Sequence, residues 1–207
     1  MKIIGICGSS GSGKSYVCGL FAKYGIAHID TDKLYREVTV KGGTACLKEL
    51  TESFGDEILD ENGELNRRAL SKIVFEGENA REKRELLNSI THKHILIDTN
   101  ALIEKYRQEG KRAVLVDAPL LFESGFNKIC HFTICVTSPL EEKIQRIIAR
   151  DKISESSAVL RLKAQKSDEE LRALCDYEID NSSTSDQRCQ IESQIEIQIE
   201  SLISKII

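Results

Sequence analysis

The sequence predicts an α/β fold in which a five-stranded parallel sheet carries helices on both faces. Two observations support this prediction. Most of the short runs rich in β-branched residues are apolar almost throughout, as expected for strands that are covered on both sides. Helical patterns separate the runs, and such alternation indicates a parallel sheet with right-handed crossovers. The expected strands are Lys2–Cys7, Ile26–Ile29, Ala113–Val116, Phe132–Val136 and the weaker candidate Tyr177–Ile179.

Two segments interrupt this alternation of strands and helices. Leu65–Tyr106 contains no strand candidate and is dense in Arg, Lys and Glu, which predicts a helical insertion of two or three helices. Lys152–Glu169 also lacks a strand candidate and carries alternating charge with few large apolar residues. This second pattern predicts a short, mobile helical flap.

The C-terminal segment carries two overlapping patterns. Ile191, Ile195, Ile199 and Leu202 recur at helical spacing. Ile195, Ile197 and Ile199 also alternate as in a strand. The length of the segment, its Gln and Glu content and its lack of turn residues favour a helix packed on the sheet. A coiled coil is the weaker alternative, because fewer than three clean heptads are present.

Composition narrows the functional classes. The 207 residues carry a net charge of −4, so we expect no nucleic-acid partner. No apolar stretch approaches the roughly 20 residues that span a bilayer, and the apolar N-terminus is too short for a signal peptide. The seven cysteines are odd in number and lie mostly in apolar runs, which indicates buried thiols in a reducing compartment. We therefore expect a cytoplasmic protein with no membrane partner, and the oligomeric state stays open.

A phosphate-binding loop is the strongest local signal. Residues Gly8–Ser15 satisfy G-x-x-x-x-G-K-[ST] at every fixed position, between an apolar strand and a helical pattern. Glycines let successive backbone amides converge on a polyphosphate. Lys14 supplies charge to the β- and γ-phosphates, and the Ser15 hydroxyl is placed to ligate Mg²⁺. The alternative, a glycine-rich turn that matches by chance, is disfavoured by its position at the first strand–helix junction. We expect ATP to contact Gly11, Ser12, Gly13, Lys14 and Ser15.

Carboxylates close the second and third expected strands. Asp30 and Asp32 follow the second strand, and the carboxyl ends of parallel strands line the edge where ligands bind. One of the two can cap the helix that follows, and we assign this role to Asp30. Asp32 is assigned to orient or deprotonate an attacking hydroxyl. Asp117, at the end of the third strand, either helps to hold Mg²⁺ or caps the next turn.

Arginines and histidines give weaker signals. Arg146 and Arg150 share one helix face next to the predicted flap. They either complement the C-terminal end of the helix or reach the γ-phosphate, and the position of Arg150 beside the flap favours function. His92 and His94 are two residues apart, on different helix faces, so a paired metal site is not expected. His92 is either a surface residue or a substrate contact, and the sequence pattern alone favours the surface.

Further segments match one family in order and spacing. They are Ile29–Asp32 with Arg36, Phe54-Gly55, Gly63–Arg67 with Leu70, Val74-Phe75, His92 and Ile95, Pro119–Glu123, Arg146 with Arg150-Asp151, Ala164-Gln165, and Asp176–Asn181. Together with the phosphate-binding loop, these segments resemble the dephospho-coenzyme A kinase family over nearly the whole chain.

The resemblance implies a three-layer P-loop kinase fold and a specific reaction. The enzyme would phosphorylate the ribose 3′-hydroxyl of dephospho-CoA with ATP and Mg²⁺, the last step of CoA synthesis. Residues 1–62, 111–149 and 167–207 would form the nucleotide-binding core, residues 63–110 a helical acceptor-binding insertion, and residues 150–166 the lid. The implied catalytic residues are Asp32, Lys14 and Arg150. The implied ATP contacts include Tyr16 and Arg146, and the implied acceptor contacts are Asp32, Arg36, Arg67, His92 and Leu120.

The chain departs from the family pattern at four positions. Cys7 and Asn66 stand where Thr and Asp are usual, Tyr16 replaces a small residue, and Lys93 replaces the Pro that usually follows the His. Two other functions stay open from the residues alone: a nucleoside or nucleotide kinase with the same core, and a non-catalytic nucleotide-dependent switch. A GTPase switch is disfavoured, because the Asn-Lys-x-Asp base-reading motif is absent from the sequence.

Overall fold

The computed structural model describes residues 1–40, 42–76, 79–182 and 188–206. The chain divides into two compact units, one formed by Met1–Ile29 with Lys105–Ile207 and the other by Asp30–Glu104. Within the described residues, no helix has the length and apolar character needed to cross a membrane.

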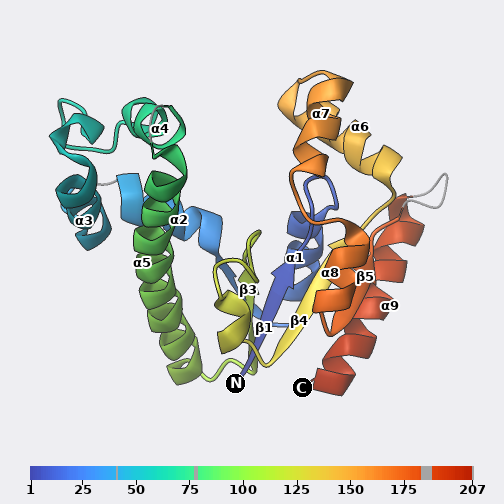
Figure 1. Ribbon diagram of the computed structural model, residues 1–207. Coiled ribbons are helices and arrows are strands. Elements are labelled where there is room, and N and C mark those ends of the chain that lie inside the picture. Colours follow the sequence, from blue (N-terminus) through green and yellow to red (C-terminus); the bar gives the residue numbers. More distant parts are fainter. Residues whose placement is uncertain (41, 77–78, 183–187, 207) are drawn as a thin grey trace. The chain divides into compact units, whose positions relative to one another are not determined.

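The first unit is built on the predicted five-stranded parallel sheet, which is confirmed. The strands lie in the order β2-β3-β1-β4-β5. Four of them, β3, β1, β4 and β5, are labelled in Figure 1. The ladders of β1 with β3, β1 with β4 and β4 with β5 are all parallel. The strands are β1 (Lys2–Cys7), β2 (Ala27–Asp30), β3 (Ala113–Asp117), β4 (Phe132–Thr137) and β5 (Tyr177–Asp180).

Both faces of the sheet are covered. On one face, Ile4 and Ile6 of β1 join a core with residues of α1 (Lys14–Ala22) and α9 (Arg188–Ile206). Because side chains alternate along a strand, Gly5 and Cys7 point to the opposite face. The Cys7 sulfur lies 3.6 Å from the sulfur of Cys175, the C-terminal cap of α8 (Asp168–Leu174). Burial on both sides explains why β1 reads as a continuous apolar run rather than an alternating one.

The C-terminal segment is a helix, as its length and composition predicted. Ile195, Ile199 and Leu202 of α9 are buried in the core, whereas Ile197 is 64% exposed. A strand would place Ile195, Ile197 and Ile199 on one face and bury all three together. The exposure of Ile197 between two buried isoleucines therefore agrees with a helix. The Gln198 amide also joins this helix to β5, because it accepts a hydrogen bond from the Asp180 N–H at 2.9 Å.

The predicted flap is helical. Helix α6 (Leu140–Asp151) is capped by Lys152, which adopts the left-handed conformation with φ of 54°. Helix α7 (Glu155–Lys163) follows the N-cap residue Ser154. Buried residues of α6 and α7 form a small apolar cluster of their own. Ser167 then starts α8 with a complete capping box. A short 3₁₀ helix, η2 (Phe126–Ile129), lies between β3 and β4.

The second unit consists of helices. These are α2 (Thr31–Val40), α3 (Ala45–Phe54), the 3₁₀ helix η1 (Asp56–Ile58), α4 (Arg67–Phe75) and the long α5 (Ala80–Gln108), whose last turn belongs to the first unit. The predicted helical insertion is therefore confirmed as secondary structure.

Two departures from the family pattern are explained by the helices of this unit. Asn66 caps α4 by accepting from the Ala69 N–H, as an Asp would, and α5 runs unbroken through Lys93. The assignment of acceptor binding to residues 63–110 and of a lid to residues 150–166 stays a prediction.

Isoleucine truncation in α9 tests the helical register. We expect Ile199→Ala to lower the free energy of unfolding by about 2–5 kcal/mol, because it opens a cavity in the core. Ile197→Ala, the same substitution at an exposed position two residues away, should change it by no more than about 0.5 kcal/mol. Urea unfolding of both variants measures the difference, and equal losses would contradict the helical register.

Candidate active site

The phosphate-binding loop, residues 8–13, joins β1 to α1 in a tight curl. Gly11 and Gly13 have φ of 79° and 84°, in the left-handed region that favours glycine. A Cβ atom on Gly13 would clash with the Asn181 amide nitrogen, and one on Gly11 would lie 2.5 Å from the Lys143 carbonyl oxygen. Glycine is thus required at positions 11 and 13 for two reasons, the backbone conformation and the close packing.

Two side chains from outside the loop bind its carbonyl groups. The Asn181 amide donates to the Ser12 carbonyl at 2.7 Å. The Arg146 guanidinium donates to the Gly11 carbonyl at 3.1 Å and to the Ser138 hydroxyl at 3.0 Å, and it pairs with Glu142 at 2.6 Å. These donors fix the direction of the loop carbonyls. Arg146 therefore positions the loop in this structure, and its contact with ATP stays a prediction.

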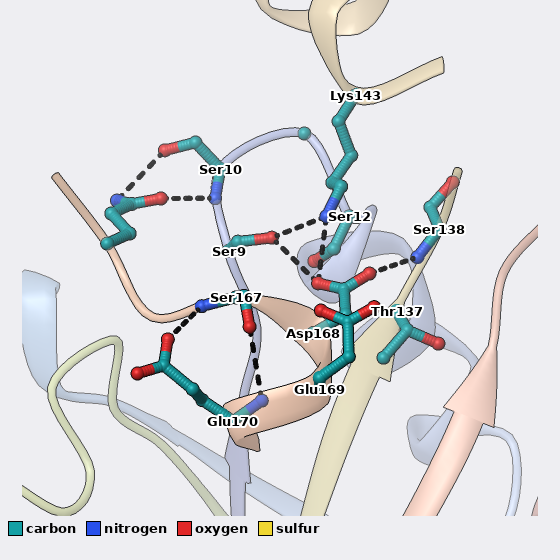
Figure 2. Close-up of polar contacts among 12 residues, drawn as sticks. Ser9, Ser10, Ser12, Thr137, Ser138, Lys143, Ser167, Asp168, Glu169 and Glu170 are labelled. Atoms are coloured by element: carbon teal, nitrogen blue, oxygen red, sulfur yellow. Dashed lines mark hydrogen bonds and ion pairs between the residues drawn. The ribbon is translucent and has the colours of Figure 1, made fainter. Parts of the chain in front are cut away.

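A buried ion pair supports the start of the loop (Figure 2). The Lys143 ammonium of α6 lies 2.8 Å from the Asp168 carboxylate at the start of α8, and both side chains contact the Ser9 hydroxyl. Asp168 also accepts from the Ser138 N–H at 3.4 Å. Next to this network, the Gln165 side chain accepts from the Ser10 N–H at 2.8 Å. Lys143, which precedes the predicted lid, and Asp168, which follows it, thus both bind the phosphate-binding loop.

Lys14 and Asp117 form an ion pair at the base of the loop. Lys14 is the first residue of α1, and Asp117 is the last residue of β3 and is 4% exposed. Burial alone would raise the pKa of Asp117, but the hydrogen bond from His28 and the charge of Lys14 hold this pKa below its usual range. Asp117 is therefore an anion at neutral pH.

The predicted magnesium ligands have the donor atoms that Mg²⁺ prefers. Ser15 is an exposed residue in the first turn of α1. Asp117 supplies an ionised carboxylate that pairs with Lys14 of the same turn. Mg²⁺ binds hard oxygen ligands and usually keeps waters and substrate phosphates in its coordination shell. The two residues fit such an ion.

Arg150 is paired with its neighbour. Its guanidinium makes two hydrogen bonds to the Asp151 carboxylate, at 2.8 and 2.9 Å. Asp151 also pairs with Arg161 of α7, and the pair with Arg150 helps to lower the pKa of Asp151 to about 2. The Arg150 side chain is 60% exposed. To act on a γ-phosphate, Arg150 must therefore exchange Asp151 for the phosphate.

Leu120 and the adjacent Leu121 have opposite surroundings. Leu121 is fully buried, whereas Leu120 is 52% exposed. Leu120 lines a cavity of about 320 Å³ together with the start of the phosphate-binding loop and residues 163–166. Glu123, from the same segment as Leu120, pairs with Lys166 at 3.1 Å. The Pro119–Glu123 segment thus both packs the core and lines a cavity.

Tyr16 lies on the exposed side of α1 at 45% exposure. Partial burial and the neighbouring Glu192 of α9 raise the pKa of its hydroxyl, so the phenol is neutral at physiological pH. The predicted contact of Tyr16 with ATP stays a prediction.

In the second unit, Asp30 has the capping contact that the sequence predicted, whereas the catalytic role of Asp32 stays a prediction. The Asp30 carboxylate accepts from the Lys33 N–H at 3.0 Å, which is a helix cap. Asp32 lies in the first turn of α2, directly after β2, and is exposed, as is Arg36 one turn later. Asp32 is therefore accessible to a ligand.

The other predicted acceptor residues lie on α4 and α5. The Arg67 guanidinium lies over the Tyr35 ring, 6.0 Å from its centroid, while the residue remains exposed. The sequence pattern favoured a surface position for His92, but the residue is half-buried. Burial lowers the pKa of His92, so the imidazole is neutral at pH 7. On the same helix, His94 contacts Glu49 at 2.7 Å, which gives it a structural partner.

Several residues that shape the site were not predicted to belong to it. From the sequence, Lys143 and Asp168 are expected to be ordinary surface charges of helices, since no neighbouring residue predicts their burial. Asn181 directly follows β5, so a polar residue at the carboxyl end of a strand was an available signal. His28 lies inside a short apolar run, and its contact with Asp117 depends on the pairing of strands.

Fold and site together define the class of protein. A parallel sheet whose first strand leads into a glycine loop, with the loop lysine paired to an aspartate at the end of a neighbouring strand, is the arrangement of P-loop nucleotide-binding proteins. The family model for dephospho-CoA kinase matches residues 2–187. The chain therefore belongs to the dephospho-CoA kinase family, and it is a kinase.

Individual relatives and solved structures are similar to this chain over most of its length. The dephospho-CoA kinase of Corynebacterium diphtheriae is 38% identical over 186 residues, which cover 90% of this chain and 91% of the relative. A solved structure from Thermus thermophilus matches with a TM-score of 0.77 and 29% identity, over 100% of this chain and 98% of that one. The dephospho-CoA kinase from Campylobacter jejuni matches with a TM-score of 0.69 and 26% identity, over 99% and 98% of the two chains.

Removal of the buried lysine tests its support of the loop. We expect Lys143→Ala to cost about 3–5 kcal/mol in the free energy of unfolding, because Asp168 is left as an uncompensated buried charge. Arg81→Ala breaks an exposed pair with Glu85 and should cost no more than about 1 kcal/mol. Urea unfolding compares the two variants, and similar losses would show that the Lys143 pair is no more important than a surface pair.

Proposed function

We propose that this kinase transfers the γ-phosphoryl group of ATP to the ribose 3′-hydroxyl of dephospho-CoA, giving CoA and ADP in the last step of CoA synthesis. The observation that carries the proposal is the phosphate-binding loop, with its Lys14–Asp117 pair, in a chain that matches the family over residues 2–187. The relative from Corynebacterium diphtheriae, named dephospho-CoA kinase, supports the choice of acceptor.

In the proposed reaction, the chain contributes binding and proton transfer. The loop amides and Lys14 hold the β- and γ-phosphates, and ATP also contacts Gly11, Ser12, Gly13, Ser15, Tyr16 and Arg146. Asp32 accepts the proton of the 3′-hydroxyl while the new O–P bond forms and the bond to the ADP oxygen breaks. Arg150 leaves Asp151 and stabilises charge on the transferred group. Its exposure and its position at the end of α6 support this role.

The magnesium ion is proposed to enter with ATP. Ser15 and Asp117 would hold it, directly or through water, and their oxygen donors support this assignment. When bound, the ion neutralises charge on the β- and γ-phosphates. Lys14 and Ser15 are adjacent at the start of α1, so one helical turn supplies both the ammonium group and the hydroxyl ligand.

Acceptor contacts are proposed for Asp32, Arg36, Arg67, His92 and Leu120. The two exposed arginines suit the phosphates of dephospho-CoA, because guanidinium groups bind phosphate oxygens in a bidentate manner. Neutral His92 offers one donor and one acceptor nitrogen. We further propose that the protein acts in the cytoplasm on small molecules, without a nucleic-acid or membrane partner.

An acceptor panel tests the function. With ATP and Mg²⁺, wild-type protein should phosphorylate dephospho-CoA at the 3′-oxygen and should act far more slowly on uridine, cytidine and short nucleotides. Product analysis by mass spectrometry and ³¹P NMR identifies the modified hydroxyl. Lys14→Ala should weaken both ATP binding and turnover, which shows that the activity belongs to this chain. Preferred phosphorylation of a nucleoside would overturn the proposal.

A matched pair of aspartate variants tests the role of Asp32. We expect Asp32→Asn to lower kcat by about 10²- to 10⁴-fold, the usual contribution of a general base, with ATP affinity largely kept. Asp30→Asn should leave kcat within a few-fold, since Asn caps a helix as well as Asp does. Steady-state kinetics and ATP-binding titrations separate the two effects. Full turnover by Asp32→Asn would remove this residue from the mechanism.

A further inference from the structure

Three potential metal ligands meet beside the phosphate-binding loop. They are the Cys18 thiol, the His28 imidazole and the Asp117 carboxylate, whose ligand atoms all lie within 4.8 Å of one another. In the part of the chain that the structure describes, this is the one group of three His, Cys or acidic residues with such spacing. Cys18 and Asp117 are buried, and His28 is reached from solvent.

The fold brings these residues together from three elements. Cys18 lies one turn after Lys14 on α1, so both side chains point from the same helix face towards Asp117. His28 is on β2, the strand next to β3 in the sheet, and Asp117 ends β3. The cluster therefore rests on a helix and two neighbouring strands rather than on loops.

Two of the three distances in the cluster match those between ligands of a tetrahedral zinc ion. The Cys18 sulfur lies 3.6 Å from Asp117 Oδ2, and His28 Nε2 lies 3.4 Å from the same oxygen. With Zn–S of about 2.3 Å and Zn–N and Zn–O of about 2.0 Å, tetrahedral angles separate sulfur from oxygen by about 3.5 Å and nitrogen from oxygen by about 3.3 Å.

We propose that Cys18, His28 and Asp117 form a Zn²⁺ site that regulates the kinase by competing with its catalytic arrangement. Thiolate, imidazole and carboxylate are together the ligands of zinc, whereas Mg²⁺ prefers oxygen alone. The thiolate and carboxylate charges balance the ion, and the thiol proton is released to solvent on binding. Three protein ligands leave the fourth position for water, on the side from which His28 is exposed.

A zinc ion at this site would weaken the ion pair between Lys14 and Asp117. Lys14 contacts Asp117 Oδ1, and the cluster uses Oδ2 of the same carboxylate. A bound dication therefore lies close to the Lys14 ammonium, and the two cations repel each other. The ion also takes the carboxylate that we assign to magnesium. Zn²⁺ should consequently inhibit phosphoryl transfer, although it binds outside the ATP phosphates.

Cobalt binding tests the site without any nucleotide. Tag-free, reduced protein is titrated with Co²⁺, and the near-ultraviolet charge-transfer band of a thiolate–Co²⁺ bond is recorded. We expect one Co²⁺ per chain and loss of the band when Zn²⁺ is added. Cys18→Ala should abolish the band, and His28→Gln should weaken Co²⁺ affinity by at least about 10-fold.

Cys130→Ala is the matched control. Cys130 is a half-buried thiol that donates to the Phe126 carbonyl and lies outside the cluster, so its variant should keep the full band. Circular dichroism checks that each variant folds, and exposed His28 gives a second variant should Cys18→Ala fail. Absence of a band at millimolar Co²⁺, or a band that persists in folded Cys18→Ala or is undiminished in His28→Gln, overturns the proposal.

Regulation is then measured separately. Buffered Zn²⁺ should inhibit wild-type phosphoryl transfer, and the concentration for half inhibition should rise at least about 10-fold in Cys18→Ala. Equal sensitivity of both proteins would remove the regulatory role. This arm rests on the proposed function, whereas the cobalt titration does not. A wild-type protein that binds Co²⁺ but phosphorylates no acceptor would refute the function and leave the metal site standing.

Discussion

The tight curl of residues 8–13 is the constraint on which the nucleotide site depends. The curl places two glycines in the left-handed region and brings Gly13 so close to Asn181 that no side chain fits between them. Asn181 and Arg146 then satisfy carbonyl groups of the loop. The sheet supplies the fixed points, because β1 leads into the loop and β5 ends at the residue before Asn181. Stability of the sheet and geometry of the site are therefore coupled.

The buried ion pair between Lys143 and Asp168 positions the phosphate-binding loop more than it stabilises the fold. Removing Lys143 and Asp168 from water is costly, and a buried ion pair usually repays little more than that cost. Each partner here also contacts the Ser9 hydroxyl, and Asp168 binds the Ser138 N–H. The pair thus links α6, the start of α8 and the loop through directional hydrogen bonds. We infer that its main contribution is to hold these three segments in one arrangement.

The sequence predicted periodic elements well and tertiary pairings poorly. All five strands lie within about one residue of the predicted runs. For β1, β3 and β4 the reason is burial on both faces, which leaves a continuous apolar pattern. The loop was equally clear, since its chemistry needs adjacent residues. Lys143 and His28 gave no signal, because their partners lie 25 and 89 positions away in the sequence. The half-buried state of His92 was missed for the same reason: packing of helices, not periodicity, decides it.

Asp117 connects the catalytic and the proposed regulatory chemistry through its two oxygens. One faces Lys14, and the other faces His28 and Cys18. Burial would favour a protonated carboxyl, and the surrounding donors reverse this preference. The anion so maintained attracts any cation that fits, whether an ammonium group, magnesium with ATP or zinc. Which cation prevails is set by the other ligands at hand: oxygen donors and phosphates favour magnesium, whereas a thiol and an imidazole favour zinc. Cys18 and His28 thus give this carboxylate a second specificity that its oxygens alone lack.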